Sequence, residues 1–166
     1  MFLPFEKLPV SARLWVHQAS RNLTTNESAA ALAALRPALD TWAAHGHPLM
    51  ASATIRDNRF LVVAVDEDAG LPSGCSIDSS VHSVQAVGKQ LGLDFMDRSA
   101  AYRATDRSVH SLPLMAIRAA VADGVLTPDT LVYNTLVKTK GELQTNWLLP
   151  ASATWLKRYF ANAPVY

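Results

Sequence analysis

The run Phe60–Val65 constrains the fold of this chain more than any other segment. Its six residues, Phe-Leu-Val-Val-Ala-Val, are all apolar and include three β-branched valines and an aromatic ring. Such residues favour strands, and a run this short between polar neighbours is typical of a strand. A strand without a polar face has to be covered on both faces. The sequence therefore predicts that Phe60–Val65 is a central strand of a sheet.

A hairpin is expected immediately before this strand. Met50–Arg56 alternates between apolar and polar residues, as a strand with one buried face does. Asp57 and Asn58 separate the two runs, and both residue types are common in tight turns because they tolerate a left-handed backbone. The two runs are therefore predicted to pair as antiparallel neighbours.

Two helices flank this hairpin in the sequence. Thr24–Glu27 has the spacing of a capping box, and apolar residues then recur on one helical face as far as Gly46. Pro37 lies inside this helix, and because proline lacks an N–H group we expect a kink or an early end there. A second helix, which Ser76 can cap, is expected to end near Gly92.

These elements predict an α+β fold. A strand at Leu14–Val16 precedes the first helix, and a strand at Ala100–Arg103 follows the second. The order strand-helix-strand-strand-helix-strand from Arg13 to Tyr102 is that of the ferredoxin-like fold. We therefore expect an antiparallel sheet with helices packed on one face.

The remaining third is expected to be a C-terminal extension of the same domain. The expected elements are a hairpin of Ala100–Arg103 with Val109–Leu112, a helix from Pro113 to Ala122, a strand at Leu131–Tyr133, a polar loop at Lys138–Glu142 and a short helix capped by Ser152. The last helix carries Trp155, Tyr159 and Phe160, which are too many aromatic residues to leave in water. We expect them to dock on the domain or on a partner.

Length and charge narrow the classes of function. The 166 residues, 49% of them hydrophobic, predict a single domain over residues 1–166. Fifteen Lys and Arg face 14 Asp and Glu, so the net charge of +1 provides no general attraction for nucleic acid or anionic membranes. The central strand also lacks a basic face and, beyond Phe60, the stacking aromatics that single-stranded RNA requires. Neither nucleic acid nor a membrane is therefore expected as a partner.

The cysteine content and the N-terminal residues indicate the cellular compartment of the protein. Cys75 is the single cysteine, so no intramolecular disulfide can form, and an unpaired thiol is typical of a reducing compartment. Met1–Lys7 has no basic flank before its apolar residues and no long apolar run, unlike a signal peptide. The sequence therefore predicts a cytoplasmic location.

Three segments resemble a family of uncharacterised single-domain bacterial proteins that often carry the label "ABC transporter ATPase". They are Arg13–Val16 with Arg21, Asn58–Ser80, and Asn134–Glu142. The resemblance spans most of the chain, and its most specific part is the string Ser-Gly-Cys-Ser-Ile-Asp-Ser-Ser at residues 73–80. It brings no activity, ligand or catalytic residue with it.

The sequence does not support the ATPase label. The apolar strand ends in Asp66-Glu67, a pattern by which nucleotide hydrolases hold magnesium, but such strands are also common in ordinary cores. A phosphate-binding loop requires G-x-x-x-x-G-K-[ST], and the sequence does not contain it. The pair Gly88-Lys89 is followed by Gln90, and Ser83 stands where the first glycine belongs. ATP hydrolysis is therefore not expected.

The segment Ser73–Ser80 is the most site-like part of the sequence. Cys75 directly precedes the expected helix start, where the helix dipole favours a thiolate. Asp78 lies in the same expected first turn and opposes this effect, because a nearby carboxylate raises the pKa of a thiol. The alternative is that Cys75 is a small buried hydrophobic residue and that the turn is an ordinary capped helix start.

A set of residues is predicted to contact a ligand at or near this turn. It comprises Ser73, Gly74, Cys75, Ser76, Asp78 and Ser79 of the turn, and Asp66, Arg59, Lys138 and Lys140 from elsewhere. Glycine permits close approach to the backbone, hydroxyl groups add hydrogen bonds, and the basic side chains suit phosphate groups. A solvated charged surface is the alternative for the basic residues.

Histidines provide two further hypotheses. His17 and His82 are candidate bases for Cys75, since a thiol nucleophile needs a base within hydrogen-bonding distance. His45 and His47 stand one residue apart, but no second paired motif accompanies them, so no metal or other cofactor is expected.

The sequence contains no complete catalytic constellation, so the leading hypothesis is a binding or interaction module. Its contact site would be the Ser73–Ser80 turn, and its partner would be a small molecule or a protein, including a second copy of the chain. The alternative is a thiol-dependent enzyme or redox sensor that uses Cys75.

Overall fold

The computed structural model describes residues 1–161, which form a mixed α+β structure with four α-helices and antiparallel sheets. The chain divides into two compact units. The N-terminal unit comprises Met1–Asp97 and Leu136–Thr145, and the C-terminal unit comprises Arg98–Thr135 and the described residues that follow Thr145. The expectation of a single domain stays a prediction, and each unit is described by itself.

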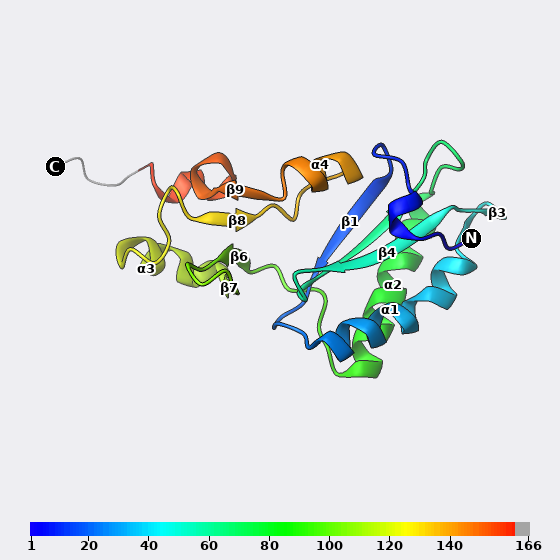
Figure 1. The fold of residues 1–166 in the computed structure, drawn as a ribbon, viewed down its shortest axis with the longest axis horizontal. Coiled ribbons are helices and arrows are strands. Elements are labelled where there is room, and N and C mark those ends of the chain that lie inside the picture. Colours follow the sequence, from blue (N-terminus) through cyan, green and yellow to red (C-terminus); the bar gives the residue numbers. More distant parts are fainter. Residues whose placement is uncertain (162–166) are drawn as a thin grey trace. The chain divides into compact units, whose positions relative to one another are not determined.

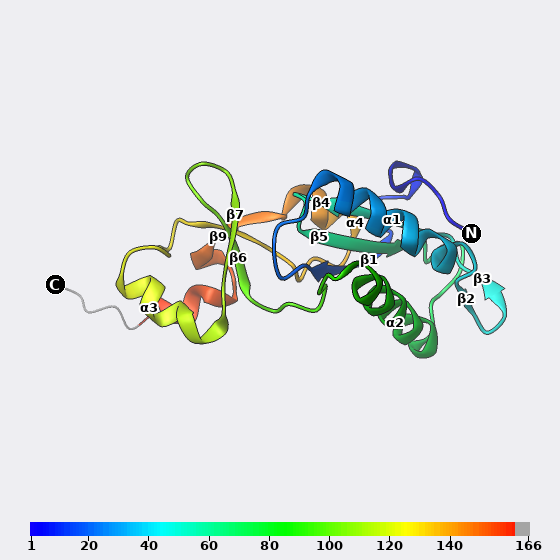
Figure 2. The same cartoon turned by 90° about the horizontal axis from the view of Figure 1, so that it is seen from below.

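The N-terminal unit is a three-stranded sheet with two long helices on one face (Figures 1 and 2). Its elements are η1 (Phe5–Lys7), β1 (Arg13–Gln18), α1 (Thr25–Asp40), β2 (Ala43–Ala44), β3 (His47–Pro48), β4 (Ala51–Arg56), β5 (Phe60–Val65), α2 (Gly74–Leu91) and α4 (Lys140–Thr145). The strand order is β1-β5-β4, and both pairings are antiparallel. The prediction of an antiparallel sheet with helices on one face is confirmed for this unit.

Strand β5 is the central strand, as its apolar sequence predicts. All six of its residues are 0% exposed. Leu61, Val63 and Val65 belong to the core beneath the helices, which also includes Leu35 and Leu39 of α1. The alternate residues of β5 point to the opposite face, because side chains alternate along a strand. Burial on both faces explains why this segment has no polar position.

Tight turns shape both hairpins of this unit. Asp57 and Asn58 connect β4 to β5 with φ angles of 54° and 49°, which confirms the predicted turn. His45 and Gly46 connect β2 to β3 with φ angles of 51° and 80°. Two successive left-handed residues are typical of the type I′ turns that join antiparallel strands.

Helix α1 begins as predicted but ends earlier. Thr24 and Glu27 form the capping box. The helix continues through Pro37 and ends at Asp40, well before Gly46. The main-chain N–H and the hydroxyl of Thr41 both donate to the Pro37 carbonyl, at 3.3 and 3.1 Å, which closes the last turn.

The ferredoxin-like strand order is not confirmed. Strand β6 (Ala100–Arg103), expected as the fourth strand of the sheet, pairs with β7 (Val109–Leu112) and β8 (Leu131–Tyr133) in the C-terminal unit. The outer edge of β1 instead contacts a distant segment. Leu14 donates its N–H to the Lys138 carbonyl at 2.9 Å, and Lys140 donates its N–H to the Ala12 carbonyl at 2.9 Å.

The C-terminal unit is a four-stranded antiparallel sheet of order β7-β6-β8-β9 with short helices. Its other elements are η2 (Leu114–Ala116), α3 (Ile117–Ala122), β9 (Leu148–Pro150), η3 (Ala151–Ala153) and η4 (Trp155–Tyr159). The predicted hairpin, the end of α3 at Ala122 and the strand β8 are all present.

The C-terminal aromatic residues dock on their own unit. Leu156 is buried in its core, and Tyr159 and Phe160 pack against the same core. Thr154, rather than Ser152, caps η4 by accepting the N–H of Leu156 at 3.2 Å. Trp155 remains 41% exposed.

Candidate functional site

The turn at Ser73 is a completed helix cap. The Ser73 hydroxyl oxygen accepts the Ser76 N–H at 3.1 Å, and the Ser76 hydroxyl oxygen accepts the Ser73 N–H at 2.7 Å. Helix α2 therefore begins at Gly74, so Ser73 is the cap and the expectation for Ser76 was wrong by three positions. Both hydroxyls are occupied by the backbone of the turn itself, which is the capped-helix alternative considered from the sequence.

Cys75 lies inside the first turn of α2 and is exposed. It is therefore not a buried hydrophobic residue. Asp78 comes after the first turn of α2. Its side chain is exposed and takes no part in the capping box. The expectation that Asp78 lies in the first turn was therefore wrong, because the helix is capped at Ser73 rather than at Ser76.

Neither expected base is within reach of Cys75. His82 is seven residues further along the same helix, which separates the two by about 10 Å along the axis. His17 is next to Gln18, whose carbonyl accepts the N–H of Asp97 beyond the C-terminal end of α2. Helix α2 has 18 residues and is about 27 Å long, so His17 and Cys75 lie at opposite ends of it.

His17 is a buried imidazole on the helix-covered face of the sheet. It is 9% exposed, lies opposite Leu61 of β5, and its Nε2 has no hydrogen-bond partner. Burial lowers the pKa of His17 from its ordinary value of 6.5 to about 4. The ring is therefore neutral in the folded protein at pH 7.

This burial predicts an acid-sensitive fold. Because the unfolded chain binds a proton near pH 6.5 and the folded chain only near pH 4, the stabilisation is complete above pH 6.5 and is lost as the pH falls towards 4. His17 alone should lower the free energy of unfolding by about 2.5 kcal/mol between pH 7 and pH 4.5. Denaturant titrations at both pH values measure this loss.

The matched variants are His17→Leu and His82→Leu. His17→Leu removes the titrating group, so its loss of stability on acidification should be smaller by that amount. His82→Leu removes an exposed histidine of α2 and is the control for the change of residue type. An unaltered pH dependence in His17→Leu would show that another group is responsible.

Two of the basic residues predicted to bind a ligand have structural roles. Arg59 is 4% exposed and donates through Nε to the Ala19 carbonyl at 2.6 Å and through Nη1 to Asn22 Oδ1 at 2.9 Å. Burial lowers the pKa of Arg59, and the carboxylate of Asp97 opposes that shift. Lys140 is 7% exposed, and its Nζ donates to three main-chain carbonyls.

Asp66 and Lys138, the other two residues predicted from outside the turn, do not form a site with Arg59 and Lys140. The Asp66 carboxylate accepts the Asp68 N–H at 3.1 Å and closes the turn after β5. Lys138 has an exposed side chain, and its main-chain N–H donates to Glu142 Oε2 at 2.7 Å. The four residues predicted from outside the turn therefore serve local structures of their own, whereas the six of the turn remain together at the start of α2.

A groove of about 370 Å³ lies in the N-terminal unit between the end of α1 and the serine-rich side of α2. Ser79 and Ser80 of the predicted turn line it. Its other lining residues are Ala38, Leu39, Thr41, Trp42, Ala43 and Ser83. We call this hollow the α1–α2 groove.

The hydroxyl groups of the α1–α2 groove all donate to their own helix. Those of Ser79, Ser80 and Ser83 donate to the carbonyls of Ser76, Ile77 and Ser79 at 2.8, 2.7 and 3.0 Å. Thr41 donates to the Pro37 carbonyl. Because each hydroxyl has one hydrogen and two lone pairs, these four oxygens remain able to accept hydrogen bonds but not to donate them.

The indole of Trp42 completes the floor of this groove. Trp42 is 5% exposed, and its Nε1–H donates to the Ser76 carbonyl at 2.7 Å. The sequence contained a signal for the serine side, since Ser79 and Ser83 are four residues apart and share a helical face. It contained none for Thr41 and Trp42, which reach the groove only because α1 packs against α2.

The pair Gly88-Lys89 is part of a helix end. Both residues lie in the last turns of α2, and the chain reverses at Gly92, where φ is 68°. Leu93 donates its N–H to the Gly88 carbonyl at 2.8 Å. A Cβ at position 88 would lie 2.5 Å from the Leu93 carbonyl oxygen, so glycine permits this close return of the backbone.

A Ser-His-Asp cluster on the β6–β7 hairpin was not anticipated. The Ser108 hydroxyl lies 2.9 Å from His110 Nε2 and donates to the Asp106 carboxylate, and this bond is the main cause of the lowered pKa of Asp106. Since the serine hydrogen goes to Asp106, His110 must donate to the serine rather than accept from it. A base that activates a serine has to accept the proton of the serine hydroxyl. His110 donates to Ser108 instead, so this arrangement does not make Ser108 a nucleophile.

Comparisons with family models, with curated proteins and with solved structures return no match. The resemblance to the uncharacterised bacterial family stays a prediction. None of the helices within residues 1–161 combines the length and the apolar character needed to cross a membrane. Over the same described residues, no three His, Cys, Asp or Glu side chains are grouped so as to hold a metal ion.

Proposed function

We propose that this protein is a non-catalytic binding module and that its ligand occupies the α1–α2 groove. The observation that carries the proposal is the set of four hydroxyl oxygens in the groove, all of which keep lone pairs for a partner. At about 370 Å³, the groove is also within the size range of small-molecule sites, roughly 300–1,000 Å³.

The composition of the groove favours binding over catalysis. Its eight lining residues include hydroxyl groups but no acid, base or thiol. General acid-base catalysis requires an acid or a base, and a hydroxyl nucleophile requires a base to activate it. The lining also contains apolar side chains, including Leu39 and Trp42. A ligand with one apolar part and a few hydrogen-bonding groups fits this lining.

The groove adjoins the turn that the sequence singled out. Ser79 and Ser80 are the last residues of the Ser73–Ser80 string, and Ser76 supplies the carbonyl that holds Trp42. The capping box at Ser73 thus positions the first turns of α2, and the later serines provide the contacts. In this proposal the turn supports the site, and the groove beside it is the site.

The proposal predicts that filling the groove weakens binding. Ala38→Leu places a larger side chain in the lining, and Ala33→Leu, on an exposed part of the same helix, is the matched control. A fragment library screened by amide chemical-shift changes should give ligands that move the Trp42 indole and Ser83 signals. Their affinity should fall at least about tenfold in Ala38→Leu, because lost van der Waals contact and steric exclusion act together.

Two results would count against this function. One is that fragments perturb other regions of the protein while the groove signals stay unchanged. The other is equal binding by the Ala38→Leu and Ala33→Leu variants, which would place the ligand outside the groove.

A further inference from the structure

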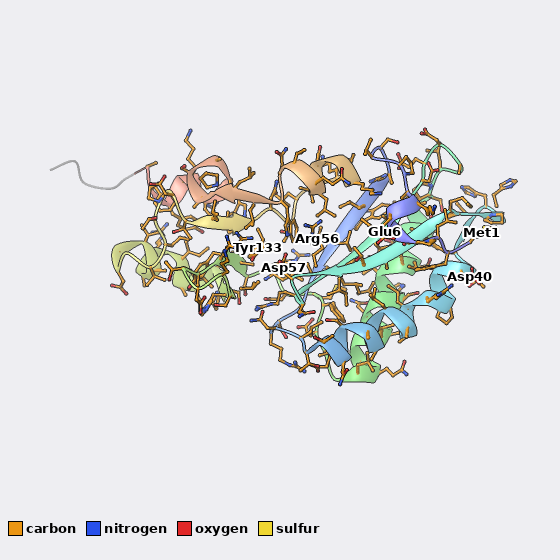
Figure 3. All side chains as sticks on the ribbon, in the orientation of Figure 1. Met1, Glu6, Asp40, Arg56, Asp57 and Tyr133 are labelled. Carbon is orange, nitrogen blue, oxygen red and sulfur yellow. The ribbon has the colours of Figure 1, made fainter. Side chains whose placement is uncertain are left out.

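The residues that line the α1–α2 groove carry no charge. Asp40 and Asp78 adjoin lining residues in the sequence, but neither lines the groove. The Asp40 Oδ1 accepts the main-chain N–H of Phe2 at 3.1 Å, and Figure 3 shows Asp40 at the C-terminal end of α1, beside Met1. The Arg36 guanidinium lies 4.8 Å from the centre of the Phe2 ring, so both signs of charge are present there. A charged ligand would therefore lose hydration in the groove without meeting an opposite charge.

The hydrogen-bond donors of the groove are already engaged. Its four hydroxyls give their hydrogens to main-chain carbonyls of their own helices, and the Trp42 indole N–H donates to the Ser76 carbonyl. The main-chain N–H groups of the lining residues inside α1 and α2 donate along those helices, and those of Thr41 and Trp42 close the end of α1. Ala43 of β2 is the one remaining lining residue, so the groove offers a ligand mainly acceptors.

Two of these acceptors have the spacing that a primary amide requires. Ser79 and Ser83 are four residues apart on one face of α2, and the Cβ atoms of residues so placed are roughly 5–6 Å apart. The two hydrogens of an NH2 group point about 120° apart, so two acceptors about 2.9 Å from its nitrogen are about 5 Å from each other. One NH2 group can therefore donate to both serine oxygens, whereas an alcohol has a single hydrogen to donate.

We infer that the ligand of the α1–α2 groove is an uncharged primary amide joined to an apolar group. This inference rests on the proposed function and adds the chemical class of the ligand. The NH2 group would donate to the hydroxyl oxygens of Ser79 and Ser83, whose own hydrogens are directed at helix carbonyls. The apolar group would pack on Leu39 and Trp42.

The test uses four probes of nearly the same shape: benzamide, acetophenone, benzoate and benzamidinium. Acetophenone has a methyl group in place of the NH2 group of benzamide and keeps the carbonyl oxygen. Titrations followed by the Trp42 indole and Ser83 amide signals should give a Kd for benzamide about fivefold below that of acetophenone. Benzoate should not bind, because its oxygens can only accept hydrogen bonds. Benzamidinium should bind no more tightly than benzamide, since no carboxylate lines the groove.

A double variant gives an independent readout. Ser79→Ala combined with Ser83→Ala removes both acceptors and preserves the helix, because alanine has the highest helix propensity. The Kd of benzamide should rise to that of acetophenone in this variant, and the Kd of acetophenone should stay unchanged. Ser20→Ala, at an exposed serine of the same unit outside the groove, is the matched control and should change neither.

The outcomes separate the two proposals. Equal affinity for benzamide and acetophenone, or tighter binding of benzamidinium or benzoate than of benzamide, would overturn the amide inference. If the binding of these probes is weakened in Ala38→Leu, the binding function remains supported. Benzamide binding that is unaffected by Ala38→Leu would overturn both proposals. The absence of groove shifts with all four probes contradicts the amide inference, and the wider fragment screen then decides the binding function.

Discussion

Replacing Lys140 with Met is expected to lower the free energy of unfolding by about 3–4 kcal/mol. The Lys140 Nζ donates to the carbonyl oxygens of Phe5, Glu6 and Leu8 at 3.1, 3.2 and 2.7 Å, and it lies 5.4 Å from the centre of the Phe5 ring. Methionine has a similar shape but no donor, so these carbonyls would lose their partner. The penalty is large because the Leu8 contact is buried.

Lys138→Met is the control for this substitution. Lys138 lies two residues away in the same segment, but its side chain is exposed, so the change in stability should be within about 0.5 kcal/mol. Denaturant unfolding followed by circular dichroism measures both variants. If Lys140→Met were as stable as Lys138→Met, Lys140 would not have the structural role assigned to it. That result would favour the ligand-binding role that the sequence predicts for Lys140.

Replacing Arg59 with Met is expected to cost about 3 kcal/mol. Arg59 connects the β4–β5 turn to the segment that follows β1, through its bonds to Ala19 and Asn22. The Ala19 carbonyl belongs to a residue that is only 1% exposed, so it would be left without this donor away from water. Stability rather than ligand affinity should therefore respond to the change.

Two further variants test this assignment. Arg59→Lys keeps the charge but lacks the planar group that reaches both acceptors, so it should recover only part of the loss. Arg118→Met removes an exposed arginine of the C-terminal unit and should have little effect. An Arg59→Met protein of unchanged stability would contradict the structural role.

The local parts of the fold were predictable because their causes lie close together in the sequence. The apolar run Phe60–Val65 could be stable only as a covered strand. Asp57-Asn58 formed the turn before it, and the pair Thr24 and Glu27 capped α1. In each case a few neighbouring residues satisfy their own backbone or require burial.

The candidate site was only partly predictable. The sequence located the serine side of the α1–α2 groove, since Ser79 and Ser80 belong to the string it singled out. It assigned Arg59 and Lys140 to a ligand because an isolated basic residue gives no sign of which carbonyls it will meet. The polar segment Lys138–Glu142, expected to be a loop, leads into the helix α4 at Lys140. Its main-chain bonds to Ala12 and Leu14 bring the Lys140 amine to the carbonyls of η1.

What the sequence by itself determined was therefore local: the central strand, its hairpin, the capped start of α1 and the presence of a single cysteine, whose exposure only the structure shows. Tertiary structure decided which sheet Ala100–Arg103 joins, which carbonyls Lys140 bonds across more than 130 residues, and that α1 meets the serines of α2. The physical reason is that strand pairing and buried hydrogen bonds depend on partners far away in the chain. Capping and periodicity depend only on neighbours, so the turn at Ser73 could be recognised before the groove beside it.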